Sequence, residues 1–175
     1  SPAAAADAAD LLRQRPDLPA FVMPAPELEA VAGFHVHRGC LAAAECGVPL
    51  DWRDVARVQG PVVVLEGVGD ADNVGSIFRH AAAFGAAGVL LGPATVDPLY
   101  RKAIRTSMGA VLRVPFARLD GRLETWPEDL AALGQGGRAI VALTLSADSI
   151  PLRQAVHQLR DTAVAILLGH EGSGL

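Results

Sequence analysis

Apolar runs that alternate with helical segments constrain the fold of this chain more than any other feature. Between residues 62 and 168, short runs rich in Val, Leu, Ile and Ala are separated by segments with the composition of helices. Strands that alternate with helices of about 10–15 residues predict βαβ units and a parallel sheet. The predicted strands are Val62–Leu65, Gly88–Leu91, Val111–Phe116, Ala139–Leu145 and Ala163–Leu168. The predicted helices are Asn73–Phe84, Pro98–Ser107, Leu123–Leu133 and Ile150–Leu159.

Capping and turn residues mark the ends of these elements. Asp72 or Asn73 is expected to cap the first helix, because a short polar side chain accepts a hydrogen bond from a free backbone N–H group. Glycines between residues 134 and 137 predict a helix end before the fourth strand. Ser149 is expected to cap the last helix, with Pro151 in its first turn. The predicted fold class is therefore α/β, a parallel sheet with flanking helices.

The first 60 residues follow a different pattern. They contain a predicted helix end at Asp10–Arg15 and a short predicted helix at Glu27–Ala32, joined by a proline-rich connection. This is too little for an independent hydrophobic core. We therefore expect residues 1–50 to be the remnant of a small domain and residues 51–60 to be a linker.

The α/β domain is expected to occupy residues 61–175. Its last residues lie in a glycine-rich loop directly after a predicted buried strand. Because domains rarely end inside such a loop, we expect the C-terminal part of this domain to follow Leu175.

Composition excludes several classes of protein. Apolar residues make up 51% of the chain and charged residues 19%, which is typical of a folded domain rather than of disorder. No apolar run reaches the roughly 18 residues that cross a bilayer, so no membrane partner is expected. No signal peptide is recognisable, and we expect a cytoplasmic protein.

The cysteines and histidines do not predict a metal site. Cys40 and Cys46 are too few for a disulfide framework and lack the spacing of metal ligands. His35 and His37 have no third ligand clustered with them in the sequence.

Charge is distributed unevenly. The net charge of −4 argues against a nucleic-acid partner. Residues 98–118, however, contain no acid, and Lys102 in this stretch is the only lysine of the chain. One interpretation is a basic surface that binds phosphate, and the other is an ordinary solvated face. The basic residues of the stretch are Arg101, Lys102, Arg105, Arg113 and Arg118.

Two glycine-rich segments follow predicted strands. The first runs through Asn73 to Arg79, and the second is Gly169–Leu175. Neither has the glycine spacing of a dinucleotide fingerprint or the lysine of a P-loop, and residues 171–175 do not match a nucleophile elbow. In a parallel sheet both segments lie at the carboxyl edge, where open α/β proteins bind ligands.

The relation of Arg79 to Asn73 leaves two interpretations open. Six residues are about 1.7 turns of helix, so the two side chains do not stack on one face. They converge on a ligand only if the loop folds back over it. The alternative is a surface arginine with Glu171 as its ion-pair partner.

These segments resemble the SpoU/TrmH-type RNA 2′-O-ribose methyltransferases of the SPOUT superfamily. Asn73-x-Gly75-x-x-x-Arg79-x-Ala81-x-x-x-Gly85 is similar to the first motif of that family, and Leu168-Gly169-His-Glu171-Gly-x-Gly174-Leu175 to the second. Residues 97–110 resemble the segment that links them. Residues 34–39 resemble the end of a small ribosomal-protein-like RNA-binding domain. The third motif of the family would lie beyond Leu175.

The resemblance implies an activity. It implies methyl transfer from S-adenosylmethionine to a ribose 2′-hydroxyl of tRNA or rRNA, by a homodimer with the SPOUT α/β-knot fold. The trefoil knot is expected if the C-terminal segment is present. One alternative is a catalytically inactive RNA-binding protein with this fold, and another is a nucleotide-binding α/β enzyme of a different type.

The resemblance also implies residue roles. Arg79 would be the central catalytic residue and would hold a phosphate, Asn73 would fix the nucleotide, and Glu171 would orient either of them. The residues expected at the cofactor are Thr144, Leu168, Gly169 and Glu171. The residues expected at the RNA are Arg79, Arg101, Lys102, Arg105 and Ser107, of which Ser107 either contacts RNA or supports the loop.

Overall fold

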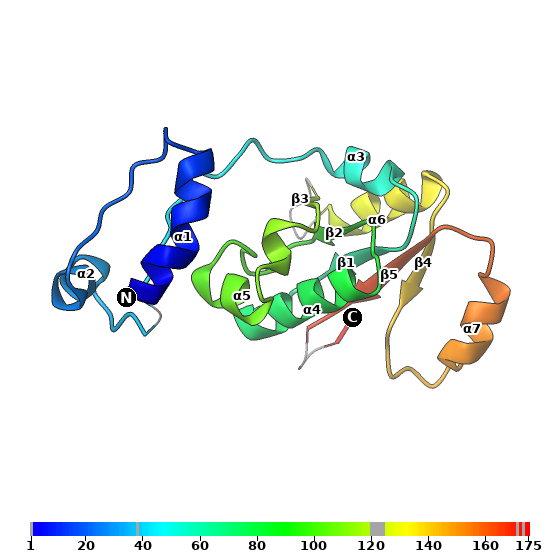
Figure 1. Cartoon of the computed structure of the whole chain (residues 1–175). Helices are drawn as coiled ribbons and strands as arrows, with labels where there is room; N and C mark the ends of the chain where they lie inside the picture. The colour runs from blue at the N-terminus through cyan, green and yellow to red at the C-terminus, as the bar shows by residue number, and fades with distance from the viewer. Residues whose placement is uncertain (1, 38, 120–124, 171, 173) are drawn as a thin grey trace. The chain divides into compact units, whose positions relative to one another are not determined.

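The computed structural model of this chain contains two compact units, residues 1–47 and residues 48–175 (Figure 1). It describes residues 2–37, 39–119, 125–170, 172 and 174–175. The side chains of residues 2–5 and 7 are not among the described ones.

The N-terminal unit holds two helices, α1 (Pro2–Gln14) and α2 (Ala25–Ala32). α2 ends at Gly33, which adopts the left-handed conformation and donates its N–H to the carbonyl of Glu29. Among the side chains described in this unit, none is buried.

The second unit is built on a five-stranded parallel sheet. Its strand order is β3-β2-β1-β5-β4, so the last strand in the sequence lies between the first and the fourth. The predicted α/β class with a parallel sheet is confirmed. The strands are β1 (Val62–Leu65), β2 (Gly88–Leu91), β3 (Phe116–Arg118), β4 (Ala139–Ala142) and β5 (Val164–Leu168).

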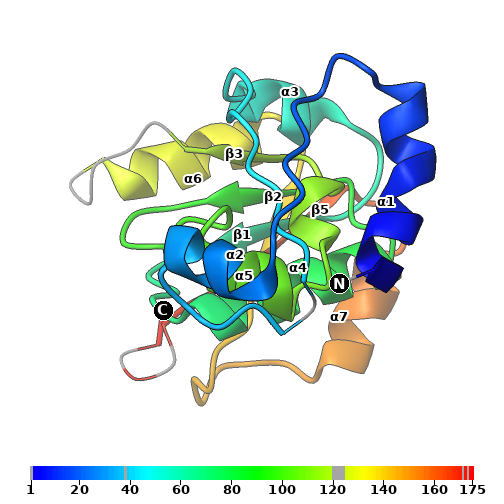
Figure 2. The same cartoon turned by 60° about the vertical axis from the view of Figure 1, so that its left-hand side comes forward.

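Helices cover both faces of the sheet (Figures 1 and 2). One face packs against α4 (Ala71–Ala83), α5 (Arg101–Thr106) and the 3-10 turn η1 (Ala110–Leu112). The other packs against α3 (Trp52–Arg57) and α6 (Trp126–Gln135). The remaining helix of this unit is α7 (Leu152–Gln158), which precedes β5.

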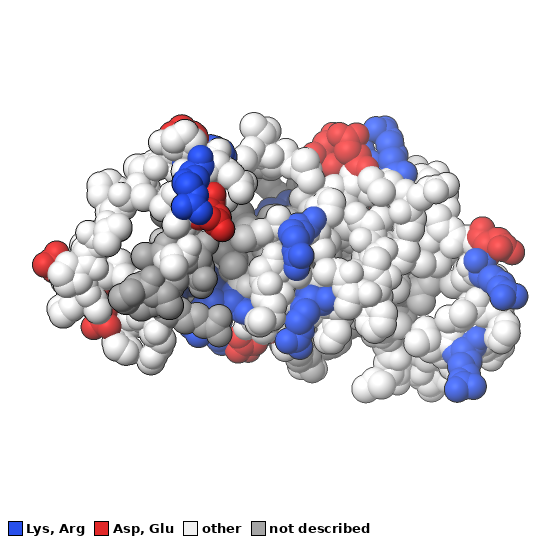
Figure 3. All heavy atoms as spheres, viewed as in Figure 1, with Lys and Arg blue, Asp and Glu red and all other residues white. Residues whose placement is uncertain are grey.

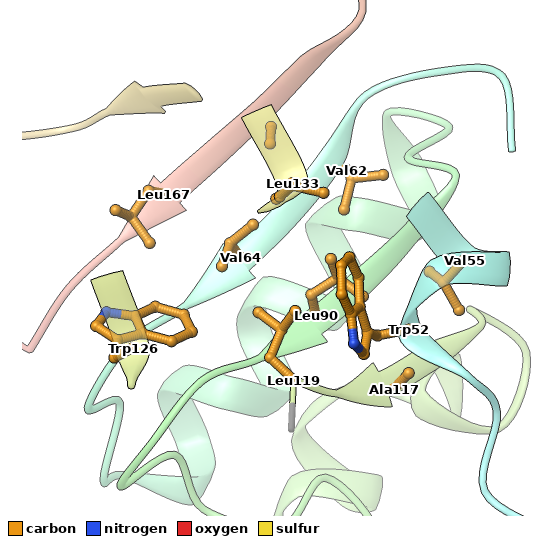
Figure 4. Close-up of a cluster of buried hydrophobic side chains, with 11 residues drawn as sticks. Trp52, Val55, Val62, Val64, Leu90, Ala117, Leu119, Trp126, Leu133 and Leu167 are labelled. Carbon is orange, nitrogen blue, oxygen red and sulfur yellow. The ribbon is translucent and has the colours of Figure 1, made fainter. Parts of the chain in front are cut away.

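The core on the α3 and α6 face is organised around two tryptophans. Trp52 and Trp126 are both buried, and Figure 4 shows their rings with the strand residues of the cluster, including Val64, Leu90 and Leu167. Each aromatic ring removes a large apolar area from water, which is the main favourable contribution to folding. These helices therefore hold the sheet that positions the loops at its edges.

Arg138 joins distant parts of the chain at the start of β4. It is buried, and its guanidinium donates hydrogen bonds to the carbonyls of Ala56, Val58 and Gly60, and also to that of Val164 in β5. Desolvation by burial lowers the pKa of Arg138 from its ordinary value. The carbonyls between α3 and β1, which lack helix or sheet partners, are satisfied in this way.

Two predicted segments differ in the structure. The third strand, predicted at 111–116, lies at Phe116–Arg118 instead, because Gly109 takes a left-handed conformation (φ +79°) and residues 110–112 form a 3-10 turn. The expected linker 51–60 contains α3, which Asp51 caps by accepting a hydrogen bond from the N–H of Arg53. Burial of Trp52 and Val55 against the sheet explains why this segment is helical.

Two predicted caps also differ. α4 is capped by Asp70, which accepts from the N–H of Asp72, rather than by Asp72 or Asn73. α7 begins after Pro151, and the hydroxyl of Ser149 donates to the carbonyl of Thr144 instead of capping the helix. The helix end predicted from the glycines of residues 134–137 is confirmed to within two residues, because α6 continues through Gly134 and ends at Gln135 rather than at Leu133.

Candidate functional site

Two loops leave the carboxyl edge of the sheet side by side. They follow the neighbouring strands β1 and β5, and the N–H of Glu66 donates to the carbonyl of Leu168 at 2.9 Å. Gly67 has φ +68°, and a β-carbon there would lie 3.4 Å from the Cβ atom of His170. After β1 the chain continues to β2, its neighbour on one side, whereas its neighbour on the other side is β5. The order of the strands therefore reverses between β1 and β5, and open α/β sheets bind ligands at such a switch point. The prediction that both loops share one edge is confirmed.

The loop after β5 is shaped by Gly169. A β-carbon at this position would lie 2.6 Å from the Cγ atom of Leu175 and 2.9 Å from the carbonyl oxygen of Gly174. The loop turns back on itself through a bridge between His170 and Gly174, and the N–H of Gly172 donates to Nδ1 of His170 at 2.8 Å. Only glycine therefore fits at position 169 without moving the end of the loop.

The residues expected at the cofactor are distributed over this edge. Leu168 ends β5 and is half-buried, Gly169 follows it, and Thr144 is exposed just after the end of β4. Because β4 and β5 are parallel neighbours, these residues lie at the same edge of the sheet. Glu171, expected to contribute to both catalysis and cofactor binding, lies outside the described residues.

Charged groups gather at the start of α4. Thr106 donates its hydroxyl to Oδ1 of Asp72 at 2.7 Å, and Nζ of Lys102 lies 2.9 Å from Oδ2 of the same carboxylate. The Thr106 hydrogen bond and the Lys102 ammonium lower the pKa of Asp72, and Asp72 in turn raises the pKa of Lys102. Lys102 also lies 3.8 Å from Asp70. These contacts join the start of α4 to α5.

Asn73 lies in the first turn of α4 and is half-buried. Two residues later, Gly75 allows α5 to approach: a β-carbon at Gly75 would lie 2.7 Å from the carbonyl oxygen of Ala103 and 2.8 Å from Cβ of Thr106. The glycine of the first motif is therefore required by the packing of two helices.

Arg79 is exposed on the same helix, farther from the carboxyl edge. Continuous helix from Asn73 to Arg79 separates the two by a rise of about 9 Å and a rotation of about 240°, as the spacing predicts. Arg79 lines a groove of about 540 Å³, the α4 groove, which also includes Ala82, Ala83, Met108, Arg113 and Pro115. The structure brings Asn73, but not Arg79, to the edge from which the two loops leave.

The other predicted RNA-binding residues have different surroundings. Arg101 and Arg105 are exposed on α5, whereas Lys102 is paired with acids as described. Ser107 is only 1% exposed, and its hydroxyl donates to the carbonyl of Ile104 and accepts from the N–H of Val111. This environment favours the second of its two expected roles, support of the loop.

Sequence reasoning did not single out Asp72, Thr106 or Arg113 as members of a site. Asp72 and Thr106 meet through the packing of two helices, which no local spacing indicates. Arg113 belongs to the basic stretch, but the sequence gives no sign that it shares a groove with Arg79.

The part of the chain that the structure describes offers neither a membrane-spanning helix nor a metal-binding cluster. No helix there is both long and apolar enough to cross a bilayer. His, Cys, Asp and Glu side chains do not form any group of three or more that would hold a metal ion.

Comparison with known proteins gives consistent results. The model of the SpoU rRNA Methylase family matches residues 60–175. An uncharacterised tRNA/rRNA methyltransferase of Mycobacterium bovis is 39% identical over 157 residues, which are 90% of this chain and 53% of that protein. The chain spans about half the length of the curated relatives it matches.

The solved structures similar to this one include two RNA methyltransferases. The AdoMet-bound rRNA methyltransferase from Sinorhizobium meliloti has a TM-score of 0.59 and 31% identity, over 69% of this chain and 45% of that one. A crystal structure of an RNA 2′-O ribose methyltransferase has a TM-score of 0.54 and 25% identity, over 81% of this chain and 47% of that one.

Proposed function

Because this chain belongs to the SpoU rRNA methylase family, we propose that it transfers a methyl group from S-adenosylmethionine to a ribose 2′-hydroxyl of tRNA or rRNA. The observation that carries the proposal is the carboxyl edge of the sheet. There the loop after β1, which leads into the helix of Asn73 and Arg79, lies against the glycine-rich loop after β5. The ribose 2′-hydroxyl as the target is supported by the first and second motifs and by one similar solved structure described as a 2′-O ribose methyltransferase.

The cofactor is proposed to bind at this edge, where its residues fit such a group. Leu168 offers a half-buried apolar side chain, and the glycines after it have no side chain to keep a ligand away from the backbone. Thr144, Gly169 and Glu171 complete the proposed pocket. When bound, S-adenosylmethionine supplies an electrophilic methyl group.

The residues of the helix are proposed to position the RNA. The planar guanidinium of Arg79 suits bidentate binding of a phosphate next to the target ribose. Arginine keeps its proton in proteins, so Arg79 acts by positioning and by electrostatic stabilisation rather than as a base. Asn73 fixes the nucleotide, and Glu171 orients Asn73 or Arg79. The 2′-oxygen takes the methyl group as the carbon–sulfur bond breaks, the hydroxyl proton passes to solvent water, and the cofactor is left as its thioether.

RNA is the proposed macromolecular partner. Arg101 and Arg105 on the exposed side of α5 are proposed to bind its phosphates, with Lys102 beside them and Ser107 as support of the loop. We further propose that the protein acts in the cytoplasm as a homodimer, as the resemblance implies.

Tritium transfer from labelled S-adenosylmethionine tests this function. The full-length gene product is incubated with unmodified total RNA, and label is counted separately in tRNA and rRNA. Arg79→Ala is expected to lower the transfer rate by about 10²–10⁴-fold, the usual loss when a transition-state interaction is removed. Cofactor affinity, measured by calorimetry, is expected to stay within error.

The control variant is Arg160→Ala, which removes an exposed arginine between α7 and β5. Its transfer rate is expected to match that of the wild type. Equal loss of transfer and cofactor affinity in Arg79→Ala would mean that Arg79 maintains the fold instead. RNA binding without label in any RNA pool would favour the alternative, an inactive RNA-binding protein.

A further inference from the structure

The turn at the end of α5 places a methionine in a strained conformation. Met108 has φ +54°, and Gly109 follows with φ +79°. The N–H of Met108 donates to the carbonyl of Arg105 and that of Gly109 to the carbonyl of Ile104, both at 3.1 Å. This is the Schellman pattern of helix ends, in which the first left-handed residue is usually glycine. Here methionine occupies that position and glycine the next.

The same helix-ending motif at the end of α4 has glycine in the first left-handed position, as is usual. The N–H groups of Gly85 and Ala86 donate to the carbonyls of Ala82 and Ala81, and Gly85 takes φ +69°. A β-carbon in this conformation is unfavourable, so glycine is the expected residue. Met108 adopts this conformation although the residue is 74% exposed, so burial in the core does not compensate for the strain. Backbone strain at an exposed residue that contributes nothing to the core points to a function.

The side chain of Met108 lines the α4 groove. Arg79 stands on one side of this groove, and Arg113 lies on the segment between η1 and β3. Ala82, Ala83 and Ala86 also line it, so no bulky side chain from the end of α4 fills it. The groove therefore presents two cations, one polarisable thioether and an apolar surface of small residues.

Both arginines are available to a ligand. Within the described part of the chain, neither Arg79 nor Arg113 makes an ion pair or a side-chain hydrogen bond. Lys102 and Arg138, in contrast, are engaged with Asp72 and with backbone carbonyls. Figure 3 shows blue side chains over α4 and over the segment that follows α5, without red atoms between them.

We propose that the α4 groove is a second nucleotide subsite. The guanidinium of Arg113 binds the RNA phosphate next to the one held by Arg79, and the thioether of Met108 contacts the face of the base between them. Sulfur makes favourable contacts with aromatic rings, and arginine pairs well with phosphate. The inference rests on the proposed function, because it takes Arg79 as the ligand of the phosphate beside the target ribose.

RNA affinity tests the phosphate contact. The full-length protein is titrated into a fluorescein-labelled single-stranded RNA of about 16 nucleotides, and the dissociation constant is measured by anisotropy at several salt concentrations. Arg113→Ala is expected to raise the dissociation constant by roughly tenfold at low salt. The slope of log K against log salt is expected to fall by about 0.7, the loss of one phosphate contact on a single strand. Arg160→Ala is the charge-matched control. If both variants changed the dissociation constant and the salt slope equally, the proposed contact of Arg113 with phosphate would be wrong.

Met108→Gly tests the methionine without risk to the fold. Glycine tolerates the left-handed conformation, so the melting temperature is expected to equal or exceed that of the wild type while RNA affinity falls by a few-fold. A lower melting temperature would overturn the argument from strain. Unchanged RNA affinity would overturn the base contact.

Methyl transfer by the same variants separates this inference from the proposed function. If the wild-type protein transfers methyl groups and Arg113→Ala has an unchanged KM for RNA, the subsite is absent and the proposed function stands. If the wild-type protein transfers none but Arg113→Ala still weakens RNA binding, the proposed function fails and the groove remains an RNA site.

Discussion

Asp72 joins two helices through one carboxylate beside the candidate site. Its two oxygens accept from the hydroxyl of Thr106 and pair with the ammonium of Lys102, both on α5. These partners stabilise the charged form, which is why the pKa of Asp72 is lowered below its ordinary value of 3.8. The same pairing raises the pKa of Lys102 above 10.5.

The sign of these shifts predicts a pH window. A lowered carboxylate pKa contributes stability above about pH 3.8, and this is lost as the pH falls through the lower pKa of the folded state. A raised lysine pKa contributes stability below about pH 10.5, and this is lost as the pH rises through the higher pKa. Asp72→Asn keeps an acceptor for Thr106 but removes the charge. We expect its melting temperature to be below that of the wild type at pH 5–8, and the difference to shrink as the pH falls below about 3.8, measured by circular dichroism.

Lys102→Met removes the cation that pairs with Asp72, and we expect it to lower the melting temperature at neutral pH by the same amount as Asp72→Asn. If the melting-temperature deficit of Asp72→Asn did not shrink at acid pH, shape rather than charge would be the cause of the loss. Since both side chains are largely exposed, solvent screens the pair and the effect is expected to be modest.

Single residues were predicted from the sequence with uneven success. The motif residues Asn73, Gly75 and Arg79 were found by their spacing, and all three lie on α4. The cap of α4 was misassigned, because three polar residues within four positions all have side chains that cap helices and only the backbone path selects Asp70. Glu171 stays a prediction.

α4 and α5 cross at an unusually close approach. Gly75 faces the carbonyl of Ala103 and the side chain of Thr106, with space for a hydrogen atom only. Close packing of this kind tolerates little added volume. The crossing therefore fixes the position of Met108 and of the α4 groove relative to Arg79.

Gly75→Ala is expected to destabilise the fold. The gain of about 1 kcal/mol from alanine in a helix is outweighed by overpacking against backbone, and we expect a net loss of about 1–2 kcal/mol in the free energy of unfolding. Urea denaturation measures it. Gly134→Ala in α6 is the matched control, because the nearest atom to a β-carbon there is 3.9 Å away. That variant is expected to gain up to about 1 kcal/mol, and equal effects of the two changes would refute the packing argument.

Helices and strands were predicted well where turn residues bound an apolar run, and poorly where the sequence gives no sign of a turn. Strands β1, β2 and β5 lie within a residue of their predicted ends. Residues 111–116 have the composition of a strand. The left-handed Gly109, however, starts a 3-10 turn, and the strand begins only at Phe116 and ends at Arg118. Helix α3 was missed because its apolar residues are few and its stability comes from burial of Trp52 and Val55.

Arg138 connects segments from opposite ends of the α/β unit. Its partners lie near α3, at the start of β1 and in β5, so one side chain satisfies carbonyls that are far apart in the chain. The sequence gives no signal of this role, because an arginine after two glycines resembles any loop residue. Long-range hydrogen bonds of this kind are visible only in the folded molecule.

Arg138→Met is expected to lower the free energy of unfolding by about 3 kcal/mol, because four backbone carbonyls lose the charged donor that a buried guanidinium supplies. Arg57→Met, which breaks an exposed ion pair with Asp54, is expected to cost less than about 1 kcal/mol. Urea denaturation of both variants measures the difference. A loss below about 1 kcal/mol for Arg138→Met would mean that water replaces the guanidinium at these carbonyls.

The strand order carries a consequence for how the molecule is made. β5 completes the middle of the sheet, yet it follows the other four described strands in the chain and leaves the ribosome after them. Until then β1 and β4 have no common neighbour, and the unpaired edge of β1 is open to other strands. Pairing of Leu65 with Leu168 closes a long loop, which makes a late, slow step with a high contact order. A nascent chain of this protein is therefore exposed to mispairing until β5 arrives, and the two strands that pair at that point, β1 and β5, are the ones whose loops form the candidate site.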